Sequence, residues 1–115
     1  MANLSVKIDA TQFEKFIKTA PQKVARAIQN SIYKITLLVE RGGKQNAPVD
    51  TGRLRSSISS TIRPMSAEVT TNTNYARYVH DGTRYMSARP FLGDAIKDVE
   101  EQVDDIMVDE LNSLD

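Results

Sequence analysis

A stripe of apolar residues with helical spacing constrains this chain more than any other feature of its sequence. The stripe consists of Val24, Ile28, Ile32, Ile35 and Val39, which recur at steps of four, four, three and four residues. This spacing predicts one face of a long amphipathic helix, with most of the charged side chains off that face. We expect the helix over about residues 21–45, with a length of about 35 Å, and we expect Gly42-Gly43 to weaken its end.

Shorter patterns before and after this helix predict a small antiparallel sheet. Apolar and polar residues alternate over Leu4–Ile8, which is the period of a half-buried strand. Two segments rich in Ser, Thr, Ile and Val, Ile58–Ile62 and Ala67–Thr73, flank Pro64-Met65-Ser66 and predict a β-hairpin. Tyr75–His80 fits either a helical turn or a third strand.

The last part of the chain predicts one C-terminal helix and completes an α+β fold. This helix begins at about Phe91, after a loop over residues 83–90, and its apolar residues share one face. These residues are Leu92, Ala95, Ile96, Val99, Val103 and Ile106. The order of the elements is typical of an α+β fold, with a long N-terminal amphipathic helix packed on a small antiparallel sheet. Since the chain has 115 residues, we expect a single domain over residues 1–115.

Charge is divided unevenly along the chain, although its formal net charge is zero. Residues 1–93 carry 14 Lys and Arg against 6 Asp and Glu, whereas residues 94–115 carry one Lys against 9 Asp and Glu. The two parts therefore have net charges of +8 and −8. Such a division often reports on binding partners. The acidic C-terminal helix and tail, about residues 94–115, could equally be a solvated helix face.

Several residue patterns suggest enzyme chemistry, but none is supported by its surroundings. Asp50-Thr51-Gly52 matches the motif of aspartic proteases, which act as a pair of aspartates sharing a proton. That motif sits between apolar strands, whereas here Pro48 precedes it and Arg53 follows it. His80-Asp81 could pair a general base with a carboxylate, yet adjacent residues on a short element rarely face each other. The chain has no Cys, which excludes disulfides and thiolate metal sites.

Three blocks of the sequence resemble a widespread family of small bacteriophage proteins. The blocks are Ala47–Ile58, Asn74–Thr83 and Ala88–Leu92, and they occur in the family's order and with its spacing. The family comprises neck or tail-completion proteins of long-tailed phages, which are also labelled tail components or minor capsid proteins. One departure is His80-Asp81, where many members carry Glu and an aromatic residue before Gly-Thr.

The resemblance implies a non-enzymatic structural protein without catalytic residues or cofactors. It implies a ring-forming adaptor between the portal or connector and the tail, with genomic DNA passing through. Its partners would be further copies of itself and the portal, connector and tail proteins, but not a membrane. It would reside in the virion, at the head–tail junction, after assembly in the host cytoplasm. The alternatives are a tail-end protein or a nucleic-acid-binding accessory protein of a phage.

Elementary chemistry gives the motif residues structural roles that do not depend on the family. Asp50 and Thr51 are expected to cap the turn before Leu54, and Arg53 and Arg55 to form fork-shaped bonds to carboxylates. The remaining motif residues are expected to shape turns or fill the core. Tyr75 and Tyr78 are expected to pack on the long helix, and Gly82 and Thr83 to turn the chain. The last helix is expected to follow Arg89 and Pro90 and to be anchored in the core by Phe91. The exposed candidates for contact with a partner are Arg84, Tyr85, Met86, Asp98, Glu101, Asp105 and Asp109.

Overall fold

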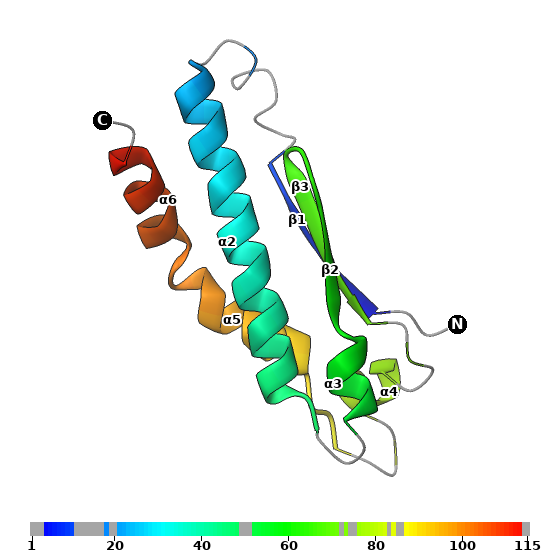
Figure 1. The fold of residues 1–115 in the computed structure, drawn as a ribbon. Coiled ribbons are helices and arrows are strands. Elements are labelled where there is room, and N and C mark those ends of the chain that lie inside the picture. The colour runs from blue at the N-terminus through cyan, green and yellow to red at the C-terminus, as the bar shows by residue number, and fades with distance from the viewer. Residues whose placement is uncertain are drawn as a thin grey trace.

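A computed structural model of the chain describes residues 4–10, 18, 21–48, 52–71, 73, 76–82, 84 and 87–113. Its central element is the helix α2 (Gln22–Asn46), which has a sheet on one side and two C-terminal helices on the other (Figure 1). This arrangement confirms the predicted α+β fold and the predicted long helix. The molecule is elongated along α2, with extents of 53 × 25 × 21 Å.

The end of α2 is closely packed rather than weakened. We expected Gly42-Gly43 to loosen the helix, but it continues through both glycines to Asn46. A Cβ atom at Gly42 would lie 2.9 Å from the Cβ of Ala95, and one at Gly43 would lie 2.7 Å from a methyl carbon of Leu92. Gly42 therefore lets the helix that carries Ala95 approach α2 more closely than a side chain there would allow, whereas the methyl group of Leu92 near Gly43 belongs to a side chain that can move.

Three antiparallel strands form the sheet in the order β1-β3-β2. They are β1 (Leu4–Asp9), β2 (Ser59–Arg63) and β3 (Ser66–Thr71), so the predicted N-terminal strand and hairpin are both present. The inward positions of β3 are Ala67, Val69 and Thr71, all buried. Outward positions of the three strands are polar, as expected for a sheet with one solvated face.

A glutamine of α2 holds the hairpin turn in place. Met65, at the turn, has a positive φ of 65°, which is uncommon for a residue with a side chain. Its backbone N–H donates to Oε1 of Gln29 at 2.8 Å, and the amide of Gln29 donates to the Arg63 carbonyl at 3.3 Å. These bonds attach the tip of the hairpin to α2 and help to fix this turn conformation.

Four shorter helices lie within the described part of the chain: α3 (Arg53–Ser57), α4 (Ala76–Asp81), α5 (Phe91–Glu100) and α6 (Val103–Asn112). Of the two predictions for Tyr75–His80, the helical turn is right and the third strand is wrong for Ala76–His80, while Tyr75 lies outside the described residues. The prediction of one continuous C-terminal helix is also wrong, because the chain bends at Glu101-Gln102. There the Gln102 N–H donates to the Val99 carbonyl at 2.8 Å, which tightens the last turn of α5. The bend redirects the chain so that α6 runs along α2 (Figure 1).

Candidate interaction surface

The acidic residues predicted to contact a partner lie on the surface of α5, of α6 and of the bend between them. Asp98, Glu101, Asp105 and Asp109 are all exposed. The opposite side of α5 is buried against α2 and the sheet through Phe91, Leu92, Ala95 and Val99. The negative charge of the C-terminal segment is therefore mostly displayed outward, on the part of the molecule that α5 and α6 form.

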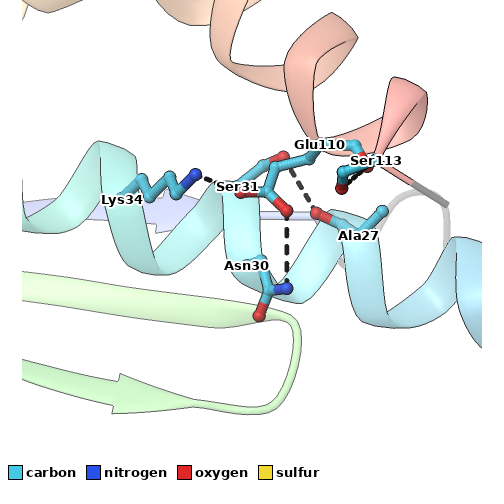
Figure 2. A network of polar contacts seen from close by, with 6 residues as sticks. All are labelled: Ala27, Asn30, Ser31, Lys34, Glu110 and Ser113. Carbon is cyan, nitrogen blue, oxygen red and sulfur yellow. Dashed lines mark hydrogen bonds and ion pairs between the residues drawn. The ribbon is translucent and has the colours of Figure 1, made fainter.

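Glu110 is the exception, because it is a buried carboxylate that joins α6 to α2. It forms an ion pair with Lys34 and accepts a hydrogen bond from Nδ2 of Asn30 at 3.4 Å (Figure 2). The hydrogen bond from the Lys34 ammonium lowers the pKa of Glu110 below its usual range, while burial acts in the opposite direction. A buried carboxylate that has charged and polar partners is satisfied within the subunit. Glu110 thus fixes α6 on α2 instead of contacting a partner.

The other predicted contact segment, Arg84-Tyr85-Met86, is described only in part. Arg84 is exposed. Tyr85 and Met86 lie outside the described residues. Their proposed role in contacts between subunits therefore stays a prediction.

The three sequence blocks converge at the end of α2 that carries Asn46. Leu54 of the first block, Ala76 of the second and Phe91 of the third are buried in one apolar cluster. The Arg89 N–H donates to the Val79 carbonyl at 2.9 Å, which ties the third block to the second. Four other motif residues lie outside the described residues, namely Asp50, Thr51, Tyr75 and Thr83. Leu54, Ala76 and Phe91 thus belong to the structural core where α2, α3, α4 and α5 meet.

Glycines and a proline of these blocks set the directions of the helices. Gly52 precedes α3 with φ of 71°, and Gly82 follows α4 with φ of 80°, a conformation that glycine adopts readily. Pro90 stands just before α5, and its carbonyl accepts the first helical hydrogen bond from the Asp94 N–H at 2.7 Å. Gly82 thus lies where the chain leaves α4, and Pro90 lies directly before α5.

Tyr78 does not have its expected position. We expected it to pack on the long helix, but its side chain is 56% exposed. The reason is that α4 directs Ala76 and Val79 toward the core, whereas Arg77 and Tyr78 lie on its outer side. Tyr78 is therefore a surface residue of the motif.

The two arginines after Gly52 differ in their surroundings. Arg53 is exposed, whereas Arg55 is half-buried beside the end of α2. Nε of Arg55 is buried and has no hydrogen-bond partner among the described residues. Arg55 lines a shallow depression of about 450 Å³ with Glu40, Arg41, Lys44 and Gln45 of α2. Three of these five side chains are cationic and one, Glu40, is a carboxylate that lies 4.0 Å from the Lys44 ammonium, so the depression has an excess of positive charge.

His80 has a role that the sequence did not reveal. Its Nε2 accepts a hydrogen bond from the Gly93 N–H at 3.2 Å, and its ring packs edge-on against Phe91. Gly93 lies in the first turn of α5, where an N–H has no partner inside the helix. Residue Pro90 in the capping position has no side chain that could accept it. His80 therefore supplies, from α4, the cap that α5 lacks.

The expectation that His80 and Asp81 do not face each other is wrong, since Nδ1 of His80 lies 2.9 Å from Oδ1 of Asp81. Both ring nitrogens are therefore engaged: the Nδ1 bond stays within α4, and the Nε2 bond joins α4 to α5. A catalytic base needs a free nitrogen within reach of a substrate. This arrangement gives His80 a structural role.

The protease interpretation is disfavoured by the geometry around Gly52. In that motif the aspartate sits between apolar strands, whereas Gly52 leads directly into the helix α3. Among the described residues, no group of three or more His, Asp or Glu side chains could hold a metal ion. No helix in the described part of the chain is long and apolar enough to cross a membrane.

Comparisons with known proteins identify a relationship for the larger part of the chain. Residues 7–82 match the family described as "Bacteriophage HK97-gp10, putative tail-component". The match covers more than half of the 115 residues and includes the first sequence block. It ends at Gly82, so Ala88–Leu92 lies beyond it. The comparison with curated proteins and the comparison with solved structures each found no match.

Proposed function

Since the chain belongs to the HK97-gp10-like family of bacteriophage tail components, we propose that it is a non-enzymatic structural protein that forms a ring at the head–tail junction. In this proposal it is a neck or tail-completion adaptor, with the portal or connector on one side and the tail on the other. Genomic DNA passes through the ring. The chain acts as a single domain in the virion, after assembly in the host cytoplasm, and uses no cofactor.

The observation that carries this proposal is the acidic surface of α5 and α6 on a chain whose remainder is basic. Asp98, Glu101, Asp105 and Asp109 are exposed, so their charges are available to a neighbouring protein. Complementary charges mainly accelerate and orient an encounter, while apolar contacts provide more of the lasting affinity. Exposed ion pairs are each worth only about 0–1 kcal/mol, so several must act together.

Neutralising the acidic surface tests this role. We expect the variant Asp98→Asn, Glu101→Gln, Asp105→Asn and Asp109→Asn to assemble more slowly on purified portal or tail components, with less dependence on salt. The variant Glu68→Gln, on the outer face of the sheet, controls for loss of acidic charge elsewhere. Normal assembly with impaired genome passage would instead make this surface a channel wall. Unchanged assembly and infectivity would leave it a solvated helix face and contradict the contact role.

Electron microscopy of the virion neck tests the position of the chain. We expect a ring of copies of this chain between portal and tail. Copies along the tail shaft, or only at the far tail end, would contradict the adaptor and favour the tail-end protein.

A nucleic-acid-binding accessory protein is the second candidate, and the net charge of +8 over residues 1–93 favours it. Binding to DNA through phosphate contacts weakens steeply as salt rises. Tight, salt-dependent DNA binding by the isolated chain would support this candidate over the adaptor.

A further inference from the structure

The solvent-facing side of α2 carries an apolar pair between basic residues. Tyr33 and Leu37, one helical turn apart, are 50% and 39% exposed. Arg26 lies before them and Arg41 after them on the same side of the helix, and both are exposed. Neither arginine forms an ion pair within the described part of the chain. We call Arg26, Tyr33, Leu37 and Arg41 the α2 stripe; it spans about 22 Å of the helix.

The outer side of α6 carries the complementary pattern. Val108 and Leu111 are 52% and 43% exposed, and they are three positions apart, so they share one side of the helix. Asp104 and Asp105 lie one turn before Val108 and are exposed as well. We call Asp104, Asp105, Val108 and Leu111 the α6 face. It combines an exposed apolar pair with negative charge on one side of that pair.

The two surfaces match in the order of their residues as well as in charge. In the α2 stripe the basic Arg41 lies four residues beyond Leu37, and in the α6 face Asp104 and Asp105 lie three or four residues before Val108. When the two helices run antiparallel and the two apolar pairs meet, Leu37 lies opposite Val108. Asp104 and Asp105 of the α6 face can then reach Arg41 of the α2 stripe. Exposed apolar patches bordered by charge are typical of protein contacts.

The Arg41 end of the α2 stripe adjoins a depression with an excess of positive charge. Arg41 lines the shallow depression that also contains Lys44 and Arg55. The buried Nε of Arg55 has no partner among the described residues, and a buried donor without an acceptor is costly. A carboxylate of an approaching α6 face can reach the exposed Arg41 at the rim of this depression.

The two surfaces cannot meet within one subunit. Glu110, on the inner side of α6, is bonded to Lys34 and Asn30 of α2 (Figure 2). Residues on the outer side of α6 therefore point away from the α2 of their own subunit. Both surfaces remain exposed in the monomer, so each is available to another molecule.

We infer that the α6 face of one subunit docks on the α2 stripe of a second copy of this chain. The contact joins two different surfaces, so each bound subunit still offers one free α2 stripe or one free α6 face. Such a head-to-tail contact produces a ring when its rotation closes. The inference thus rests on the proposed ring-forming function and specifies the surfaces that build the ring.

Thiol cross-linking tests this contact directly, because the chain contains no Cys. Virions are assembled with the double variant Leu37→Cys, Val108→Cys and treated with a short bifunctional thiol reagent. We expect a ladder of covalent dimers, trimers and larger species of this chain. The single variants Leu37→Cys and Val108→Cys are the matched controls, and neither should give a ladder, because the contact pairs position 37 with position 108.

Three results would overturn the inference. Cross-linked dimers from Leu37→Cys alone would show a two-fold contact through α2. Cross-links only to a different virion protein would make that protein the partner of these surfaces. Absence of any cross-link in the double variant would show that the surfaces do not meet.

A charge reversal tests the order of the contact. Arg41→Glu should lower incorporation of the chain into virions by roughly tenfold, which is the effect of losing one important contact at an interface. Adding Asp105→Arg to the same chain restores an opposite-charge pair at every contact and should recover most of the incorporation. If the double variant is as poor as Arg41→Glu, the acidic end does not meet Arg41 and the inference is wrong.

Failure of the proposed contact can be distinguished from failure of the proposed function. Electron microscopy of the same particles locates the chain independently of the ladder. A ladder from copies found away from the head–tail junction would contradict the adaptor but support the contact. A ring at the junction without a ladder would support the adaptor but contradict this contact.

Discussion

Replacing Gly42 with Ala brings two opposing effects into direct competition. In the interior of a helix, Ala is favoured over Gly by about 1 kcal/mol, so an unobstructed site would be stabilised. At Gly42, however, the added Cβ would lie 2.9 Å from the Cβ of Ala95. Ala95 is fully buried and its side chain has no rotatable bond that could move the methyl group away, so α2 and α5 must separate.

The cost of that separation should exceed the helix gain. The shortfall from ordinary van der Waals contact, which begins at 3.4 Å, is about half an ångström. Overpacking of this kind typically costs about 1–3 kcal/mol. We therefore expect Gly42→Ala to lower the free energy of unfolding by about 1 kcal/mol net. For a chain of this size, that corresponds to a fall in Tm of about 4 °C.

Thermal and denaturant unfolding of a double-mutant cycle measures the effect. Ala95→Gly removes the opposing methyl, so the double variant Gly42→Ala, Ala95→Gly should be more stable than the sum of the single changes predicts, by at least about 1 kcal/mol. Gly93→Ala is the matched control, because a Cβ there would make only ordinary contacts, at 3.6 Å or more. Stabilisation by Gly42→Ala, together with an additive cycle, would refute the close approach of the two helices.

Three further changes test other parts of the structure. Phe91→Ala should cost about 3–5 kcal/mol, because the ring is buried in the main core; an unchanged Tm would place Phe91 outside it. His80→Ala should cost about 1 kcal/mol through loss of the cap on the Gly93 N–H, and hydrogen exchange should be faster at that amide; unchanged exchange would argue against the cap. The pKa of Glu110 is lower in the folded chain than in the unfolded chain. Its carboxylate therefore stabilises the fold at neutral pH, and this stabilisation is lost as the pH falls through the pKa of the folded state. Glu110→Gln should therefore be less stable than the wild type at pH 7, and the difference should narrow below about pH 4; a difference that is independent of pH would contradict the role of the ion pair.

The parts of the fold that follow from local periodicity could be predicted from the sequence. The apolar stripe predicted the long helix to within a residue at each end, because apolar steps of three and four residues place every member on one side of a helix but on both faces of a strand. The strand and the hairpin followed from alternation and from turn residues in the same way. The family resemblance, which rested on three blocks of motif residues, is confirmed for residues 7–82.

Features that depend on contacts between distant segments could not be predicted in this way. The apolar spacing continues without a Gly or Pro through Val99 and Val103, so nothing local indicates the bend at Glu101-Gln102. Gly42-Gly43 looked like a weak helix end because the sequence does not show that Ala95 and Leu92 lie against it. Pro90 did offer an indirect signal for the cap, since a helix that follows a proline without a capping side chain must obtain an acceptor from elsewhere in the fold.

The helix α6 links the folding of the subunit to its proposed assembly. Its inner side is modest as a core surface, because Val103, Ile106 and Met107 are only half-buried and the one buried residue is the charged Glu110. Its outer side leaves Val108 and Leu111 in water. A second copy that covers this outer side would bury apolar surface that the subunit alone leaves exposed, and burial of apolar surface stabilises whichever state achieves it. Docking on a neighbour's α2 stripe would therefore stabilise α6 more than α5, which is already buried against its own α2. The bend at Glu101-Gln102 thus separates α5, which packs mainly in the core of its own subunit, from α6, which in this proposal mainly contacts a neighbouring subunit.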